Sequence, residues 1–396
     1  MEIRKITPEE RLTASKIQTI AFFSSRDFSQ ASENPQEFQK NYETGRAVFN
    51  EAGKMCACLE LIPYEIRFLG HTVKMGGIGG VATLPEERQR GYIRKLFTYC
   101  FDEMQENGQV FSYLYPFSHA YYRQFGYETC LNLIQYTIPF SSFSHFPKRG
   151  EFRFYLPDME RKDLVEVYNK FIEDKNLAIV RNDRMWQDRL GQDPYKTVQY
   201  TYIWYNEKNE ARGYVQFQLK RKENAGPDMD VKELIWLDRD TLVGILGNLK
   251  VFAAQFQNFL WRAPEFLNLP LLFPEVYHLK QELVTSGMNR IVDLKKALSL
   301  VRYPEKAGSI VLEVRDNFLP WNNGTFSVAW DKGEVEVKES SKSPDLICDI
   351  QGLTQLLTGY VSLDDLLLRE ATVVHKAYSL LSSLFPKKPL YLADYF

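Results

Sequence analysis

The chain has 396 residues, a formal net charge of −2 and 44% hydrophobic residues, which is the composition of an ordinary globular protein. The sequence has no basic tail or Lys/Arg cluster for nucleic acid, and no apolar run near the ~20 residues that span a bilayer. Its five cysteines and five histidines show no spacing typical of a zinc site. We therefore expect a cytoplasmic protein of two or three domains with reduced thiols, and no metal, nucleic acid or membrane as a partner.

Two early segments carry local signals. Thr7-Pro8-Glu9-Glu10 has the pattern of a capping box with proline at the first helical position, so it predicts a helix start. The strand-like run Met75–Val81 contains paired glycines, which often mark a place where another backbone or a ligand comes close. By itself, this run is more typical of an ordinary glycine-rich turn.

The stretch from Val81 to Arg94 is the most informative. A short apolar strand ends at Thr83, and a loop with Arg88, Arg90 and Gly91 leads into a helix. The apolar face of that helix comprises Ile93, Leu96, Phe97, Cys100, Phe101 and Met104. A helix N-terminus favours an anion. The guanidinium groups can bind that anion, and the glycine lets it come close to the backbone. The pattern therefore predicts a diphosphate site.

A second informative segment follows this helix. Val110–Tyr115 is short and rich in β-formers, which predicts a strand. Ser118–Tyr127 then predicts a short helix that contains Tyr122 and is closed by Gly126.

Together these segments resemble the acetyl-CoA site of GNAT-superfamily acyltransferases, whose pyrophosphate loop reads Arg/Gln-x-x-Gly-x-Gly/Ala. The resemblance implies a splayed glycine-rich strand that binds the pantetheine arm, and a Tyr122 hydroxyl that gives its proton to the leaving thiolate. Ile93 departs from the pattern, which usually has a small residue there, and a surface ion pair with Glu86 or Glu87 is the alternative for Arg88. The implied acetyl-CoA-binding residues are Val81, Ala82, Thr83, Arg88, Gln89, Arg90, Gly91, Tyr92, Ile93, Arg94, Phe117 and Ser118.

A turn-rich linker at 143–150 predicts a first domain over 1–146 and a second over 147–287. Within the second, the predicted strands Thr197–Tyr205, Gly213–Leu219 and Glu233–Leu237 are followed by a helix from about Asp240, an order that parallels the first domain. In place of the basic loop this unit has Asp-Arg-Asp-Thr from residue 238, and carboxylates at a helix N-terminus repel a phosphate. We interpret it as a degenerate copy.

The remaining residues, 288–396, predict an α+β module. Antiparallel strands are expected at Ile310–Arg315, Thr325–Trp330 and Glu334–Lys338, with helices at Leu353–Thr358 and Asp364–Leu368. The chain ends in Tyr391-Leu392-Ala393-Asp394-Tyr395-Phe396, and such an apolar end is expected to pack into the protein.

The whole arrangement resembles the enhanced intracellular survival (Eis-like) acetyltransferases: a GNAT domain, a degenerate GNAT domain and a sterol-carrier-like domain, in α/β and α+β classes. The resemblance implies direct acetyl transfer to an amine in a ternary complex, with the terminal carboxylate of Phe396 and Tyr122 as catalytic groups. It also implies a homo-oligomer, such as a hexamer.

An aminoglycoside or polyamine acceptor is the expected small-molecule substrate by the same resemblance. A polycation needs carboxylates for affinity, and Asp27 and Asp394 are the candidate substrate-binding residues. A non-catalytic acyl-CoA or lipid-binding sensor is the alternative function.

Overall fold

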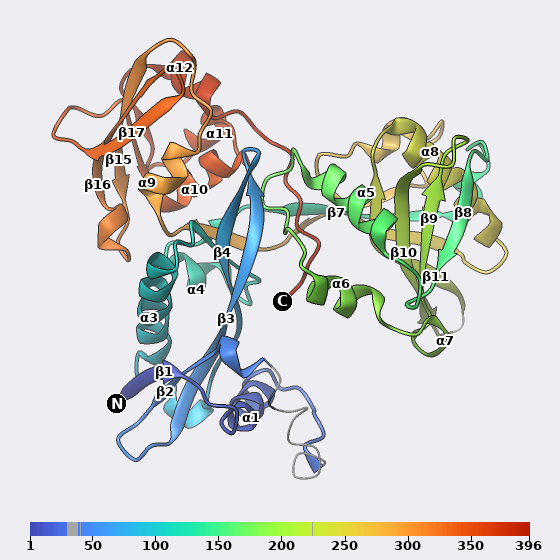
Figure 1. The fold of residues 1–396 in the computed structure, drawn as a ribbon, viewed down its shortest axis with the longest axis horizontal. Helices are drawn as coiled ribbons and strands as arrows, with labels where there is room; N and C mark the ends of the chain where they lie inside the picture. Colours follow the sequence, from blue (N-terminus) through green and yellow to red (C-terminus); the bar gives the residue numbers. More distant parts are fainter. Residues whose placement is uncertain (30–38, 40, 224) are drawn as a thin grey trace.

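A computed structural model describes residues 1–29, 39, 41–223 and 225–396, and Figure 1 shows their fold. The strands of these residues form three sheets, each with its own helices. This arrangement confirms the predicted mixture of α/β and α+β units. No helix in the described ranges is long and apolar enough to cross a membrane.

The first sheet has the strand order β1-β2-β3-β4-β5-β14-β6. Its strands are β1 (Glu2–Lys5), β2 (Gly45–Phe49), β3 (Met55–Phe68), β4 (His71–Thr83), β5 (Phe111–Leu114), β6 (Glu128–Thr129) and β14 (Met288–Ile291). Its helices are α1 (Arg11–Ala21), α3 (Tyr92–Glu106) and α4 (His119–Arg123). The apolar face predicted for α3 is buried from Leu96 to Met104, whereas Ile93 is half-buried.

The second sheet has the order β13-β7-β12-β11-β10-β9-β8. Its strands are β7 (Asn132–Pro139), β8 (Glu151–Tyr155), β9 (Gln199–Tyr205), β10 (Ala211–Lys222), β11 (Ala225–Trp236), β12 (Asn258–Pro264) and β13 (Lys280–Thr285). Its helices are α5 (Lys162–Ile172), α6 (Asp183–Leu190), α7 (Pro194–Thr197) and α8 (Arg239–Leu249).

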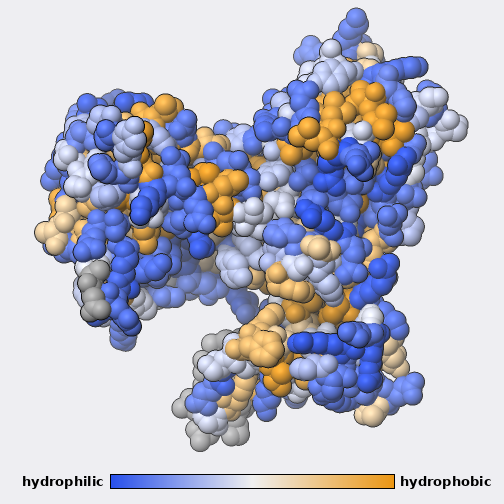
Figure 2. All heavy atoms as spheres, turned by 180° about the vertical axis from the view of Figure 1, so that it is seen from behind, coloured by the Kyte–Doolittle hydropathy of each residue, from blue (hydrophilic) through white to orange (hydrophobic). Residues whose placement is uncertain are grey.

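The third sheet has the order β17-β16-β15-β18-β19. Its strands are β15 (Gly308–Arg315), β16 (Gly324–Asp331), β17 (Glu334–Glu339), β18 (Leu346–Asp349) and β19 (Val373–Val374). Its helices are α9 (Leu294–Ser299), α10 (Ile350–Thr358), α11 (Leu363–Leu366) and α12 (Tyr378–Leu384). Figure 2 views the molecule from behind and shows polar residues over most of that face, with apolar side chains gathered on the lobe of this sheet.

The first two sheets exchange strands across the expected boundaries. β7 lies before residue 146 in sequence but pairs with β12 and β13 of the second sheet. β14 lies after residue 287 but pairs with β5 and β6 of the first. The predicted cuts at 146/147 and 287/288 therefore do not coincide with the division between the sheets, because backbone pairing joins segments more than a hundred residues apart.

Candidate functional site

The strands β4 and β5 separate at the centre of the first sheet. They pair in parallel only from Met75 to Ile78, opposite Phe111 to Leu114. Beyond Ile78, β4 continues to Thr83 and pairs only with β3, so the edge that faces away from β3 has no strand partner among the described residues. Val81, Ala82 and Thr83 lie on this stretch. Free backbone groups of this kind suit the amides of a pantetheine arm.

The loop after β4 leads to a helix N-terminus without a side-chain cap. Gln89 and Gly91 adopt left-handed backbone conformations, with φ of 61° and 74°. Gly91 is the N-cap residue of α3, and no side chain accepts a hydrogen bond from the first backbone N–H groups, those of Tyr92, Ile93 and Arg94. These N–H groups remain available to an anion. The residues present therefore fit a diphosphate.

The three arginines near this N-terminus differ in their contacts. Arg90 forms an ion pair with Glu87 at 3.0 Å. The sequence had suggested Glu87 as a partner of Arg88, but the structure pairs it with Arg90. Arg94 lies over the ring of Phe318, 4.9 Å from its centroid. Arg88 is exposed and has no hydrogen bond or ion pair with the described part of the chain. Its guanidinium is therefore free to bind a phosphate.

Helix α4 positions Tyr122 beside the end of β5. The Ser118 hydroxyl accepts a hydrogen bond from the Tyr121 N–H at 3.3 Å and so caps this helix. The ring of Tyr122 is buried, and burial raises the pKa of its phenol above the ordinary value of 10. Phe117 is 72% exposed and packs edge-on against Tyr122, with 5.4 Å between ring centroids. The phenol is thus a proton donor that stays neutral at ordinary pH.

The last residue of the chain lies against the glycine-rich part of β4. A Cβ atom placed at Gly77 would be 2.7 Å from the ring of Phe396, and one at Gly79 would be 3.7 Å from its carboxyl carbon. The ring packs against Tyr64 and Tyr115, at centroid distances of 4.8 and 5.5 Å. The predicted close approach at these glycines therefore exists, and the approaching group is the chain's own end.

The carboxylate of Phe396 has no hydrogen-bond or ion-pair partner among the residues that the structure describes. The carboxylate lies against Gly79 of β4, at the point where this strand stops pairing with β5. An unpaired carboxylate at that place is available to an ammonium group or to a water molecule.

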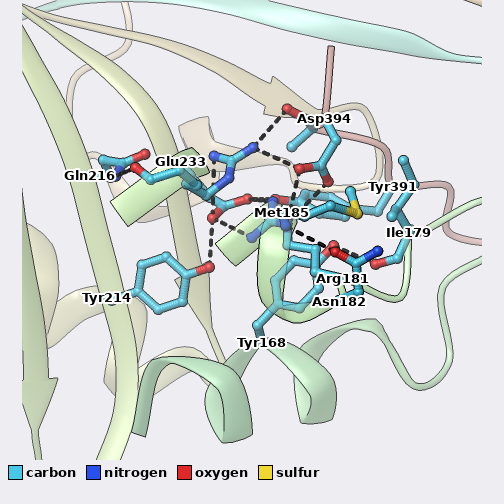
Figure 3. A network of polar contacts seen from close by, with 12 residues as sticks. Tyr168, Ile179, Arg181, Asn182, Met185, Tyr214, Gln216, Glu233, Tyr391 and Asp394 are labelled. Atoms are coloured by element: carbon cyan, nitrogen blue, oxygen red, sulfur yellow. Dashed lines mark hydrogen bonds and ion pairs between the residues drawn. The ribbon is translucent and has the colours of Figure 1, made fainter. Parts of the chain in front are cut away.

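A buried polar network from the second GNAT-like unit fixes the residues just before this end (Figure 3). Arg181 forms ion pairs with Glu233 at 2.5 Å and with Asp394 at 2.9 Å, and its side chain is fully buried. Arg189 of α6 also binds Asp394, at 3.0 Å. The terminal segment is thereby connected to β11 through Glu233.

Tyrosines complete the network. The hydroxyls of Tyr214 and Tyr391 donate to Glu233 at 2.6 and 3.0 Å, and the Tyr115 hydroxyl donates to the Asp394 carbonyl oxygen at 2.8 Å. Burial opposes ionisation of Glu233, but the two arginines outweigh it and hold the pKa of Glu233 well below its usual range. We did not single out Arg181, Arg189 or Glu233 from the sequence, because no local motif distinguishes them from solvated charges.

The candidate substrate-binding acids have different surroundings. Asp394 is neutralised by the two arginines, and its side chain is 12% exposed. Asp27 is exposed, and its carboxylate accepts a hydrogen bond from the Ser29 N–H at 2.8 Å. Asp394 therefore has no carboxylate oxygen free of an arginine, and the Asp27 carboxylate is bound within its own turn.

Comparisons with known proteins agree with this geometry. Residues 2–130 and residues 177–291 each match a family model described as an acetyltransferase (GNAT) domain. Residues 294–393 match the sterol carrier protein domain. A sequence comparison with curated proteins gives no match.

Several solved structures share the fold over the whole chain. A GCN5-related N-acetyltransferase from Anabaena variabilis has 23% identity and a TM-score of 0.87, with 100% of both chains covered. A probable N-acyltransferase from Enterococcus faecalis has 23% identity and a TM-score of 0.88, with 100% of this chain and 99% of that chain covered. Eis1 from Mycobacterium abscessus has 17% identity and a TM-score of 0.82, with 100% of both chains covered. The chain therefore contains two acetyltransferase (GNAT) domains and a C-terminal sterol carrier protein domain, and it shares its fold over the whole length with Eis1.

Proposed function

We propose that the chain transfers the acetyl group of acetyl-CoA directly to an amine, with its own terminal carboxylate at the site of attack. The observation that carries the proposal is the unpartnered carboxylate of Phe396 against Gly79, on the strand that separates from β5. The uncapped N-terminus of α3 supports acetyl-CoA as the donor.

The chemistry divides between two groups of this chain. A carboxylate with an ordinary α-carboxyl pKa of about 3.3–3.7 is a weak base. The role of the Phe396 carboxylate is therefore to hold the acceptor ammonium group and a water molecule, and this water takes the proton of the ammonium group. The amine nitrogen then bonds to the acetyl carbonyl carbon, and the bond from that carbon to sulfur breaks. The Tyr122 phenol gives its proton to the departing thiolate. Unpaired backbone N–H groups near Val81 to Thr83 stabilise the oxyanion.

The test is to lengthen the chain by a few residues after Phe396, with the same residues added before Met1 as the matched control. The added residues remove the free carboxylate from Gly79, so we expect turnover with amines to fall by about 10²-fold or more. The acetyl-CoA dissociation constant is expected to be unchanged, because the α3 N-terminus is intact.

Equal turnover by the two lengthened proteins would contradict a role for the carboxylate. Tight acetyl-CoA binding by the unmodified protein, without turnover of any amine, would instead favour the acyl-CoA sensor.

A further inference from the structure

A cavity of about 590 Å³ lies between the second sheet and the terminal segment of the chain. One side is the face of β7, β11 and β12 that carries Gln135, Asp230 and Arg262. The other side includes Tyr115 and Tyr395, whose rings pack at a tilt of 34° with centroids 4.3 Å apart. Because Tyr115 also packs against Phe396, the cavity adjoins the end of the chain.

The acidic residues that line this cavity are already neutralised. Glu233 is held by Arg181 and is only 2% exposed (Figure 3). Asp230 forms an ion pair with Lys232 at 2.7 Å and also accepts a hydrogen bond from Gln218. No unpaired carboxylate therefore lines the cavity within the described residues.

Two cationic side chains of the lining have no acidic partner. Lys220 makes no ion pair or hydrogen bond within the described part of the chain, because Asp228, opposite it in the sheet, is bound by Lys222 and Asn258. Arg262 uses only its Nε, which donates to Gln135 at 3.2 Å. Its terminal nitrogens are free to bind a carboxylate or phosphate in two-point fashion.

We infer that the acceptor carries an anionic group, a carboxylate or a phosphate, in addition to the amine that is acetylated. This inference rests on the proposed function: the amine faces the carboxylate of Phe396 and the anion lies on Lys220 and Arg262. Such a distribution of charge favours an amino acid-like or phosphorylated amine over the polycation that the Eis-like resemblance implied, because like charges in a cleft repel the second ammonium group.

The experiment uses the full chain and three acceptors that are each built on a six-carbon chain with a primary amine at one end. 6-Aminohexanoate ends in a carboxylate, 6-aminohexyl phosphate in a phosphate, and 1,6-diaminohexane in a second ammonium group. We expect kcat/KM for the better of the two anionic amines to exceed that for the diamine by about tenfold or more, since hydrogen bonds to charged groups are worth that factor. The two anionic arms distinguish a carboxylate from a phosphate.

Variants then locate the effect. The double substitution K220Q/R262Q is expected to raise KM for the anionic amine about tenfold with little change in kcat, and to remove the preference over the diamine. The control K208Q/R302Q removes one lysine and one arginine that are exposed and lie outside the cavity lining, and is expected to behave as the unmodified protein.

Calorimetric titration of the same three amines separates this inference from the transferase proposal. Binding of an anionic amine that K220Q/R262Q weakens, without acetylation, would support the anion site and contradict the transfer. Acetylation with no preference for an anionic amine, or a preference that K220Q/R262Q leaves intact, would overturn the anion site and leave the transfer standing.

Discussion

Each GNAT domain has a helix that follows a strand of its sheet, but only the second domain caps the N-terminus of that helix with a carboxylate. In the first domain Gly91 precedes α3 and no side chain caps the helix. In the second domain the Asp238 carboxylate precedes α8 and accepts a hydrogen bond from the Thr241 N–H at 2.8 Å. One N-terminus is open to an anion, and the other carries its own anion, so we expect a diphosphate to bind only at the first.

The strands beside these helices show a second contrast. β4 and β5 separate next to unpartnered groups, and β11 and β12 likewise pair only over Met229–Val231 and Phe259–Trp261. Beyond that short pairing, Arg181 and two tyrosine hydroxyls occupy the space next to β11, where they bind the Glu233 carboxylate. The second domain has thus kept the fold and uses the corresponding region to hold the end of the chain, which then lies in the first domain.

The largest effect is expected at Tyr122. Removing its hydroxyl in Y122F takes away the proton donor, and we expect kcat to fall about 10²- to 10⁴-fold with the acetyl-CoA dissociation constant unchanged. Steady-state kinetics and calorimetry measure the two quantities. Y121F is the matched control on the same helix, and a similar fall in kcat there would contradict a specific role for Tyr122. Because burial raises the pKa of Tyr122, loss of its proton is not expected to limit kcat of the unmodified enzyme below about pH 10.

The network of the second domain is expected to dominate stability. E233Q removes one of the two counter-charges of the buried Arg181 and leaves it with Asp394 alone, and the loss of one member of a buried ion pair costs about 3–5 kcal/mol of unfolding free energy. Urea unfolding measures it. D188N, which breaks the exposed Arg184–Asp188 pair of α6, is the control and is expected to unfold as the unmodified protein does. Equal effects of the two substitutions would show that the network adds nothing to stability.

The difference in unfolding stability between the unmodified protein and E233Q is expected to depend on pH. The folded-state pKa of Glu233 is lower than its ordinary value of 4.5, so its contribution is fully present above pH 4.5 and is lost as the pH falls toward the folded value. We therefore expect the stability difference between the unmodified protein and E233Q to narrow as the pH falls below 4.5. A difference that stays constant down to pH 3 would contradict ionisation of Glu233 in the fold.

The smallest effect is expected at Gly91. A Cβ atom there meets nothing within 4 Å, so G91A costs only the left-handed conformation, about 1–2 kcal/mol, together with weaker diphosphate binding. Gly53 has a φ of 76° and the same open surroundings in the turn after β2, so G53A imposes the same strain outside the site. Only G91A is expected to raise the acetyl-CoA dissociation constant, by several-fold. An equal rise in both variants would contradict diphosphate binding at this loop.

Local chemistry determined much of the first domain. The spacing of apolar residues fixes the buried face of α3 from Leu96 to Met104, and Ser118 and Gly126 bracket the segment that carries Tyr122. Asp238 likewise predicts a helix N-terminus that rejects phosphate, since an N-cap carboxylate binds backbone N–H groups within three residues of itself. These features depend on residues that are close together in the sequence, and they can therefore be predicted from it.

Only the tertiary structure decided how the distant segments meet. The exchange of β7 and β14 cannot be predicted from strand patterns, because alternation shows which face of a strand is buried and not which strand pairs with it. Arg181, Glu233 and Asp394 are separated by more than fifty residues at each step, and each by itself has the pattern of a solvated charge. The apolar end of the sequence predicted that the chain would pack inward. Only the tertiary packing places Phe396 against Gly77 and Gly79, and at Gly77 a side chain would collide with the Phe396 ring, because a Cβ atom there would be 2.7 Å from it.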